Sequence, residues 1–288
     1  MLEEQASTIR QWLDKADRVL IGAGAGLSAA AGVDYTDEVA FARQFPALVN
    51  RGIRAAYQMI GEHSLPPALF WGYWLRHVND VRFGSGVRPV YQHLFQLVRR
   101  KDWSVLTSNV DALFVRNGFA EDRICSIQGD FAFLQCMRPC SDELWPSAPV
   151  LERLLPEIDP HTQALRDAGL VPTCPRCGGD VFFNVRGGAW FVETPWRRQF
   201  KALQEWLASG PNDRLVVLDI GSGFNTPGVV RWPMERAAAA IPSARFVRIN
   251  RHDPALHFKL GERAITVAAG ALEMLDAITR ARPAEVPR

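Results

Sequence analysis

The stretch Asp17-Arg-Val-Leu-Ile-Gly-Ala-Gly-Ala-Gly-Leu-Ser28 decides the fold of this 288-residue chain. Its apolar first half predicts a short buried strand, its three glycines predict a tight turn, and Ser28-Ala-Ala-Ala31 predicts the start of a helix. A strand, a glycine-rich turn and a helix in this order are typical of nucleotide-binding folds. The missing side chains would let backbone N–H groups approach a diphosphate, whose charge the helix N-terminus also favours. A purely structural glycine turn remains an alternative.

Three further apolar runs end in small or polar residues, as strands of a parallel sheet do at a ligand crevice. They are Trp103–Thr107, Leu215–Ile220 and Arg245–Asn250. Helical stretches at 89–100, 196–209 and 228–240 lie between them. This alternation predicts the α/β class with an open, doubly wound, Rossmann-like parallel sheet. The acidic residue that dehydrogenases carry about 20 positions after the glycine turn is not evident.

Two stretches break the alternation. Residues 38–88 are rich in Phe, Trp, Tyr and Arg and predict an inserted helical module. Residues 131–184 carry four cysteines and little periodic apolar pattern, apart from a helix-like segment near Leu151–Leu170. We therefore expect a Rossmann-like domain formed by residues 1–130 and 185–288, with a helical insertion at about 38–88, and a small metal-binding module formed by residues 131–184.

The bulk composition limits the classes of partner. The chain is 48% hydrophobic and 22% charged, with a net charge of +2, and its acids and bases are interspersed. Nothing in this charge pattern predicts a nucleic-acid or membrane partner. No apolar run approaches the roughly 18 residues of a membrane helix. The N-terminal segment lacks the basic start and apolar centre of a secretion signal, which predicts a cytoplasmic protein.

Four of the five cysteines are paired by spacing. Three residues separate Cys136 from Cys140, and two separate Cys174 from Cys177. Because reductants keep cytoplasmic thiols reduced, metal binding is a better interpretation than disulfides. Four thiolates would close the tetrahedron of a Zn²⁺ ion and leave no open position, so we expect a structural site. Cys125 has no second cysteine at such a spacing, and we expect it to be an ordinary buried thiol.

Two polar strings lie between the glycine turn and the second cysteine pair. Thr107-Ser-Asn-Val-Asp-Ala-Leu-Phe114 ends a predicted strand, and Ile127-Gln-Gly-Asp-Phe131 precedes Cys136. Taken alone, each string is typical of a turn with hydrogen-bonding side chains. Their order relative to the other motifs is the informative feature.

In that order the chain resembles the sirtuin family over nearly its whole length. The family's glycine motif is similar to Gly24–Ser28 continuing to Gly32-Val-Asp-Tyr35, and its Thr-Gln-Asn-Ile-Asp-x-Leu-His motif is similar to Thr107–Phe114. Its His-Gly, zinc-ribbon, Gly-Thr/Ser-Ser and Ile-Asn motifs are similar to Gln128-Gly129, the four paired cysteines, Gly221-Ser-Gly223 and Ile249-Asn250. The resemblance implies NAD as co-substrate and a structural Zn²⁺.

The residues expected to contact the dinucleotide follow from the glycine turn and from these motifs. They are Gly22, Ala23, Gly24, Ala25, Gly26, Ser28, Asp34, Tyr35, Ser108, Asn109, Asp111, Gln128, Gly221, Ser222, Gly223, Asn250 and Arg251.

The departures from the deacylating sirtuins are specific. Gln128 stands where those enzymes carry the histidine that acts as general base, Ser108 replaces a Gln, and Phe114 replaces a His. In the cofactor loop the expected Pro is absent and Thr36 occupies the position of an Arg. This altered set resembles the macrodomain-linked, or class M, sirtuins. That resemblance implies a protein ADP-ribosyltransferase acting on a lipoyl-carrier protein akin to glycine cleavage H protein, with a macrodomain hydrolase as its expected partner.

A carboxamide cannot take up a proton near neutral pH, whereas imidazole, with a pKa of about 6.5, can. Loss of the base should suppress deacylation by a factor of about 10² to 10⁴ and leave nicotinamide departure intact. The resemblance implies that Asn109 orients the nicotinamide ribose or a water and that Asp111 holds the nicotinamide carboxamide. Gln128 is expected to fix the ribose hydroxyls, so these three form the expected catalytic set. Asp130 is a candidate base for an Arg or Lys acceptor.

Three other functions stay open. A deacylase could use a displaced base among His63, His77 and His93, although each is expected on a helix surface. An NAD glycohydrolase would use water as the acceptor. A noncatalytic NAD-binding module would leave the dinucleotide intact.

Overall fold

The computed structural model describes residues 1–62, 64–84, 86–210 and 213–281, and the chain divides into two compact units. The first unit comprises Met1–Val33, Val87–Gln128 and Pro195–Arg288, and the second comprises Asp34–Gly86 and Gly129–Thr194. The aromatic-rich insertion and the cysteine-bearing segment thus belong to one unit. None of the helices in the described part of the chain has the length and apolar character of a membrane-spanning segment.

A six-stranded parallel sheet forms the centre of the first unit. Its strands are β1 Arg18–Ala23, β2 Asp102–Thr107, β3 Ile124–Ser126, β7 Leu215–Ile220, β8 Arg245–Ile249 and β9 Ala264–Val267. They lie in the order β3-β2-β1-β7-β8-β9, and each neighbouring pair is parallel. The strand order reverses between β1 and β7, as in doubly wound nucleotide-binding sheets. The predicted fold class is confirmed.

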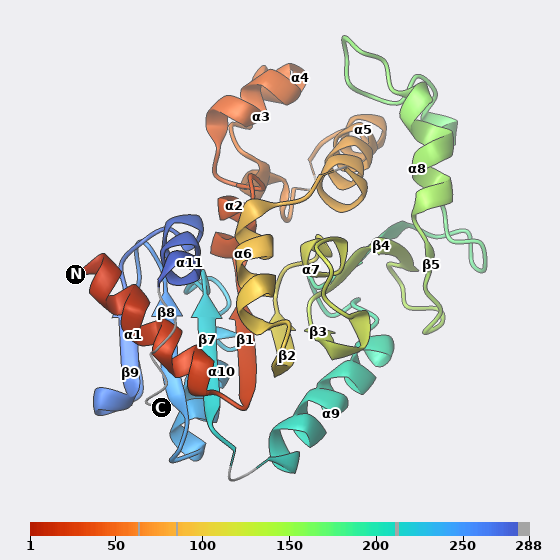
Figure 1. Ribbon diagram of the computed structural model, residues 1–288. Helices are drawn as coiled ribbons and strands as arrows, with labels where there is room; N and C mark the ends of the chain where they lie inside the picture. The colour runs from red at the N-terminus through yellow and green to blue at the C-terminus, as the bar shows by residue number, and fades with distance from the viewer. Residues whose placement is uncertain (63, 85, 211–212, 282–288) are drawn as a thin grey trace. The chain divides into compact units, whose positions relative to one another are not determined.

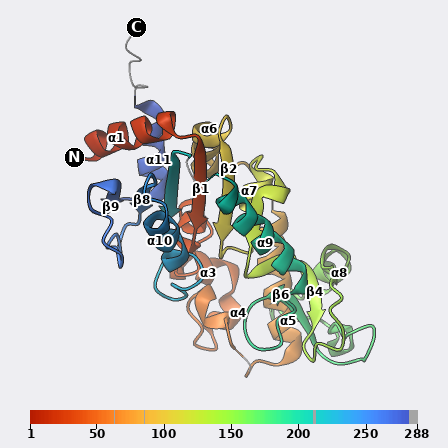
Figure 2. The same cartoon turned by 90° about the horizontal axis from the view of Figure 1, so that it is seen from below.

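Helices cover both faces of this sheet (Figures 1 and 2). One face carries α1 Leu2–Lys15, α6 Pro89–Val98 and α11 Ala271–Arg280, the other carries α9 Thr194–Ser209 and α10 Arg231–Ala240, and the short α2 Ala25–Ala30 and α7 Leu113–Arg116 follow β1 and β2. Side chains alternate between the faces, so Val19 and Ile21 join one core cluster and Leu20 joins the other. Because both faces are buried, the strands are continuous apolar runs.

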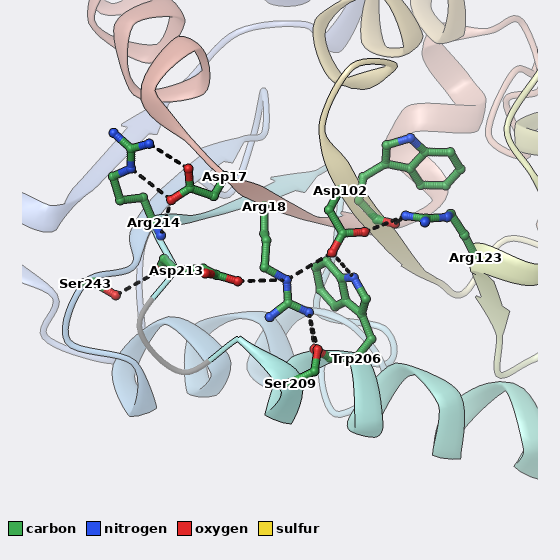
Figure 3. A network of polar contacts seen from close by, with 10 residues as sticks. Asp17, Arg18, Asp102, Arg123, Trp206, Ser209, Asp213, Arg214 and Ser243 are labelled. Carbon is green, nitrogen blue, oxygen red and sulfur yellow. Dashed lines mark hydrogen bonds and ion pairs between the residues drawn. The ribbon is translucent and has the colours of Figure 1, made fainter.

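Charged side chains tie the amino ends of the strands to α9 (Figure 3). The guanidinium of Arg18 lies 3.9 Å from the ring centroid of Trp206 and within 3.3 Å and 3.7 Å of the carboxylates of Asp102 and Asp213. The indole N–H of Trp206 donates to the same Asp102 carboxylate at 2.8 Å. Arg18 is nearly buried, so these contacts offset the loss of its hydration. Ion pairs with a structural role therefore join this end of the sheet to α9.

The second unit combines helices with a three-stranded antiparallel sheet. The sheet has the order β5-β4-β6, with β4 Gly129–Cys136, β5 Trp145–Pro146 and β6 Val181–Val185. The helices are α3 Glu38–Gln44, α4 Pro46–Val49, α5 Pro67–Val78 and α8 Ala148–Leu154. Trp74 of α5 contacts Phe131 and Phe182 of the sheet, with ring centroids 6.0 and 5.0 Å apart. An aromatic cluster is thus the core of this unit.

The remaining helical elements are single turns. In chain order they are η1 Ala56–Met59, the π-helix η2 Asn79–Phe83, η3 Glu121–Arg123, η4 Leu155–Glu157, η5 Ala168–Leu170 and η6 Gly261–Arg263.

The helix predicted near Leu151–Leu170 is wrong beyond its first turn. The helix α8 ends at Leu154, and a single 3-10 turn that contains Pro156 follows. The carboxylate of Asp159 then accepts the backbone N–H of Thr162 at 2.8 Å. Proline lacks the N–H that a helix needs, and an Asp side chain competes for the N–H groups that follow it.

Backbone contacts between two glycine turns join the carboxyl ends of β1 and β7. The N–H of Gly24 donates to the carbonyl of Ile220 at 3.1 Å, and the N–H of Gly26 donates to that of Gly221 at 3.0 Å. A Cβ added at Gly24 would lie 2.6 Å from the Gly221 oxygen and 2.7 Å from the Ser222 Cα. The glycines are therefore required for the close approach of the two turns.

We expect Gly24→Ala to lower the free energy of unfolding by about 1 to 3 kcal/mol, because the added methyl meets backbone that cannot move aside. Gly223→Ala is the matched control, since nothing lies within 4 Å of a Cβ at this position of the second turn. Urea unfolding of both variants and the wild type measures the difference. Equal stability of Gly24→Ala and Gly223→Ala would contradict the requirement for a glycine at position 24.

Candidate functional site

The carboxyl ends of the strands form one row, because the register pairs their last residues. Ala23 pairs with Thr107 and with Ile220, Thr107 pairs with Ser126, and Ile220 pairs with Ile249. The residues that follow each strand therefore lie along one edge of the sheet. This edge carries most of the expected site residues, which belong to turns after β1, β2, β3, β7 and β8.

Asn109 and Asp111 follow β2 and are tied to the turn after β1. The amide of Asn109 donates to the carbonyl of Gly24 at 3.0 Å. The hydroxyl of Ser28 donates to Asp111 Oδ2 at 2.5 Å, while Asp111 Oδ1 accepts the N–H of Leu113 at 2.9 Å. Asn109 and Asp111 are 9% and 4% exposed, so both side chains are held inside the first unit rather than in solvent.

The residue after Asp111 has a strained backbone. Ala112 has a φ of 52°, in the left-handed region that residues with a Cβ seldom occupy, and it precedes α7. Such a conformation costs of order 1 to 3 kcal/mol and persists only where the surroundings fix it. The turn at Asp111 is therefore set by its contacts and not by local preference.

Gln128 lies in the turn after β3, at the end of the first unit. It stands two residues beyond Ser126, as Asn109 stands two residues beyond Thr107, and these strand ends are register partners. Its side chain is half-buried. Gly129 has a φ of +94°, and a Cβ there would lie 2.0 Å from the Asn184 carbonyl. A glycine is thus obligatory directly after Gln128.

The turn after β7 is exposed at Gly223 but turned inward at Ser222. The hydroxyl of Ser222 donates to Asp219 at 2.8 Å, and its carbonyl accepts the amide of Asn250 at 2.9 Å. Asn250 in turn accepts backbone N–H groups of the loop that it begins. The guanidinium of Arg251 would meet a Cβ added at Gly270 at 2.6 Å, so it packs closely on that turn. The expected contact residues of this turn and of the loop after β8 therefore lie together. The hydroxyl of Ser222 is already engaged in its hydrogen bond to Asp219.

A buried charge cluster, which no motif of the sequence indicated, supports this part of the edge. Asp219 and Arg248 are register partners on β7 and β8, and Arg248 lies 2.6 Å from Asp219 and 2.7 Å from Glu235. All three are 0% exposed. Burial raises the pKa of Asp219, and Arg248 opposes that rise. The signal available in the sequence was that Asp219 and Arg248 are charged residues inside two apolar runs.

The cluster also fixes the loop that follows β8. Glu235 Oε2 accepts the backbone N–H groups of His257 and Phe258 at 2.7 and 2.8 Å. Arg231 donates to the carbonyls of Ser222, Asp253 and Ala255 at 2.7 to 2.9 Å. Two guanidinium groups thus hold the turn after β7 and the loop after β8 in one arrangement.

The other expected residues belong to the second unit. Asp34 accepts the N–H and hydroxyl of Thr36 at 2.8 and 2.7 Å, which forms a local turn. The hydroxyl of Tyr35 lies 3.0 Å from His77 Nε2. His77 is 8% exposed, so its expected place on a helix surface is wrong. The helix α5 is apolar on several sides, and burial lowers the pKa of His77 to about 4.

The four paired cysteines meet in the second unit with the geometry of a zinc site. Their sulfur atoms all lie within 4.8 Å of one another, and the Cys136–Cys177 and Cys140–Cys174 pairs are each 3.6 Å apart. A Zn–S distance of about 2.3 Å in a tetrahedron gives about 3.8 Å between sulfurs. A backbone N–H of Cys177 lowers the pKa of Cys174 to about 7, which favours the thiolate. Cys125 is separate and buried, and burial raises its pKa to about 12.

We expect Cys174→Ser to lose bound zinc and to destabilise the second unit, because the small antiparallel sheet lies directly beside the metal ligands. Metal analysis and urea unfolding check this expectation. Cys125→Ala is the control and should keep its zinc. A metal-free Cys174→Ser variant with wild-type stability would contradict the structural role.

We expect Arg248→Met to lower the free energy of unfolding by about 3 to 5 kcal/mol, because Asp219 and Glu235 would remain buried without their cation. Arg245→Met removes an exposed arginine of the same strand, which contacts the Trp12 ring at 5.1 Å and the Glu262 carbonyl at 3.3 Å, and should change stability by less than about 1 kcal/mol. Thermal and urea unfolding distinguish the two variants. A mild effect at Arg248 would show that the cluster is not the support of this edge.

Two ADP-ribosyltransferases are similar to this chain in sequence, while no family model matches it. The chain is 39% identical over 235 residues to a "Probable bifunctional ADP-ribose hydrolase/ADP-ribosyltransferase" of Fusarium oxysporum f. sp. cubense, covering 80% of this chain and 39% of that protein. It is 25% identical over 268 residues to a "Protein ADP-ribosyltransferase" of Staphylococcus aureus, covering 91% and 83%. The chain therefore spans well under half of the longer, fungal relative.

Solved Sir2 structures share the fold. A structure described as "Structural Basis for the Mechanism and Regulation of Sir2 Enzymes" matches with a TM-score of 0.60 and 18% identity, covering 96% of this chain and 97% of the other. A complex of a mutant Sir2 homologue with ADP-ribose matches with a TM-score of 0.60 and 15% identity, covering 95% and 94%. The chain therefore has the fold of solved Sir2 structures, and its sequence relatives include two proteins named ADP-ribosyltransferase.

Proposed function

We propose that this chain is an NAD-dependent protein ADP-ribosyltransferase, which breaks the bond between nicotinamide and ribose and moves ADP-ribose to a protein. One observation carries the proposal. Ser28, Asn109 and Asp111 form a polar set at the strand ends, in which Ser28 is bonded to Asp111 and Asn109 to the Gly24 carbonyl, while the turn after the adjacent strand presents Gln128 in place of an imidazole. Two relatives are named ADP-ribosyltransferase, and one structural neighbour holds ADP-ribose.

The first unit offers groups suited to NAD as a substrate. The exposed backbone at Ala25 and Gly223 lies on the edge where the glycine turns meet, and nothing lies within 4 Å of a Cβ built at Gly223. Asn250 and Arg251 begin the loop beside the second turn. We infer that the turns hold the diphosphate and that this loop contacts the adenosine half. The polar set of Ser28, Asn109 and Asp111 would hold the nicotinamide half.

The proposed transfer can proceed without a base only when the attacking atom of the acceptor carries no proton that it must lose. When the bond between ribose C1 and the nicotinamide nitrogen breaks, its electron pair leaves with nicotinamide, which becomes neutral. The acceptor atom forms a new bond to C1. A carboxylate acceptor has no proton to lose, whereas an Arg or Lys acceptor must release one. Oriented dipoles such as the Asn109 amide would stabilise the positive charge that develops on the ribose.

The described residues favour the carboxylate acceptor. Gln128 cannot accept a proton, and the Asp130 carboxylate is already occupied by Arg82 at 2.6 Å and by the N–H of Ala132 at 2.6 Å. A carboxylate engaged in this way is a poor candidate for abstracting the proton of a cationic acceptor. We therefore propose an Asp or Glu side chain as the attacking group.

The same residues disfavour deacylation by a displaced base. His77 has a pKa lowered to about 4 by burial, far below the range in which imidazole is an efficient base at neutral pH. His93 Nε2 lies 3.8 Å from Asp276, between the helices α6 and α11 that cover the sheet. His63 lies outside the described residues. Among the described histidines, neither of these two candidates therefore replaces the missing base.

We further propose a lipoyl-carrier protein as acceptor and an ADP-ribose hydrolase as partner. The carrier follows from the resemblance to the class M sirtuins. The hydrolase is supported by the fungal relative, whose name joins ADP-ribose hydrolase and ADP-ribosyltransferase in one chain. The match to this chain covers 39% of that relative.

Incubation with NAD labelled in the adenine ring should transfer label to a lipoyl-carrier protein in step with nicotinamide release. Hydroxylamine at neutral pH should remove the label, because it cleaves an ester to a carboxylate. Free ADP-ribose with no labelled protein would show a hydrolase, and loss of acyl groups from an acylated peptide would show a deacylase. Intact NAD would show a binding module.

We expect Asn109→Ala to lower nicotinamide release by at least about 100-fold while the protein still folds, because it removes an oriented dipole at the reacting carbon. Asn117→Ala is the matched control. Asn117 also makes two backbone contacts, to Leu113 and Arg88 at 2.8 Å, but it lies after α7 and away from the strand ends. Single-turnover release of nicotinamide is the measurement. Equal rates for the two variants would remove Asn109 from the mechanism.

A further inference from the structure

Tyr91 of α6 is a residue beside the polar set that the sequence motifs did not indicate. Its ring is 0% exposed, belongs to the core on the α1, α6 and α11 face, and meets the ring of Phe114 edge-on with centroids 5.0 Å apart. Its hydroxyl has no hydrogen-bond partner among the described residues. A buried hydroxyl without a partner costs of order 1 to 3 kcal/mol, which a phenylalanine would avoid.

The surroundings of that hydroxyl are those of the proposed site. Burial raises the pKa of Tyr91 well above its usual value, the charge of Asp111 raises it further, and the side chains of Ser28 and Asn109 oppose the rise to a smaller extent. These three groups that act on Tyr91 are the members of the polar set. The hydroxyl is thus a buried donor among polar groups that include the Asp111 carboxylate.

The bonds within the set offer an acceptor for this donor. The Ser28 hydroxyl gives its own hydrogen to Asp111 at 2.5 Å, so its oxygen still has lone pairs that can accept. The Asp111 carboxylate also accepts the N–H of Leu113. A hydrogen bond from Tyr91 to this oxygen would complete a chain of donors from Tyr91 through Ser28 to Asp111. Hydrogen bonds in such a chain strengthen one another.

We propose that Tyr91 is a positioning residue of the NAD-cleaving site, which donates to Ser28 when the nicotinamide end is bound and thereby fixes Asp111 toward the carboxamide. The inference rests on the proposed function. It adds that Tyr91 helps to hold the nicotinamide half of NAD and does not help to hold the ADP-ribose half.

Tyr91→Phe tests the inference, because it removes one oxygen and keeps the ring in the core. We expect kcat/KM for nicotinamide release to fall about tenfold and the inhibition constant of nicotinamide to rise by a similar factor, which is the size expected for one buried hydrogen bond to a polar relay. The affinity for ADP-ribose, measured by calorimetry, should be unchanged. The midpoint of urea unfolding should be equal or higher, since an unpartnered hydroxyl has been removed.

A double-mutant cycle with Ser28→Ala supplies the decisive control. If Tyr91 acts through Ser28, Tyr91→Phe should have little further effect on nicotinamide inhibition in the Ser28→Ala background. Additive effects in the cycle, an unchanged inhibition constant in Tyr91→Phe, or an equal loss of ADP-ribose affinity would each overturn the inference. A wild-type protein that releases no nicotinamide would overturn the proposed function together with it. Wild-type activity with an unaffected Tyr91→Phe variant would overturn the inference alone.

Discussion

The contact between two glycine turns is the constraint on which the first unit depends. The turn after β1 donates two backbone hydrogen bonds to the end of β7 and the turn that follows it, and neither Gly24 nor Gly26 leaves room for a Cβ. Those N–H groups are therefore engaged with protein and are not free for a ligand. The glycines act by bringing strand ends together, and the exposed backbone at Ala25 and Gly223 is what remains to meet a substrate.

From this contact the rest of the edge follows by register. Once Ala23 and Ile220 are paired, β2 and β8 place their own last residues in the same row. Asn109 then reaches the Gly24 carbonyl and Asn250 reaches the Ser222 carbonyl. Each of these two amides thus holds a neighbouring turn as well as lying at the proposed site. Substitutions at these positions will combine a loss of chemistry with a loss of local order, which is why matched controls are needed.

The buried charges beneath the edge hold its geometry at a cost in desolvation. Arg248, Asp219 and Glu235 are wholly buried, and their desolvation opposes folding even though their contacts are short. Apolar residues of similar volume often stabilise such a site as well or better. The charges instead orient the loop after β8, because Glu235 and Arg248 bind its backbone atoms. The cluster therefore orders this loop, and the burial of its charges opposes folding.

The parts of the fold that could be predicted are those whose sequence signal is local. The four strands β1, β2, β7 and β8 are buried on both faces and therefore appear as apolar runs. The edge strands β3 and β9 have only three and four residues, too few for a pattern. The antiparallel sheet of β4 and β6 was not predicted, because its pairing is between segments far apart in the chain. The helix beyond Leu154 was predicted from apolar spacing that Pro156 and Asp159 override. The same division applies to the candidate site. Motif order predicts Asn109, Asp111 and Gln128, and their roles stay predictions. The proposed role of Tyr91 has no motif behind it, because a tyrosine in an amphipathic helix is typical of a core residue and only its buried hydroxyl distinguishes it.

The chemistry that remains after the imidazole is removed defines the proposed reaction. The proposed reaction begins with the separation of nicotinamide from ribose, and that step needs oriented dipoles and a fixed carboxamide but no proton acceptor. The fate of the ribose then depends on which nucleophile is present at C1. An acyl oxygen would form an adduct that needs a base to proceed, whereas a carboxylate forms a stable ester at once. In the proposed reaction Gln128 would therefore favour an acceptor that arrives already deprotonated, because a carboxamide cannot take up its proton.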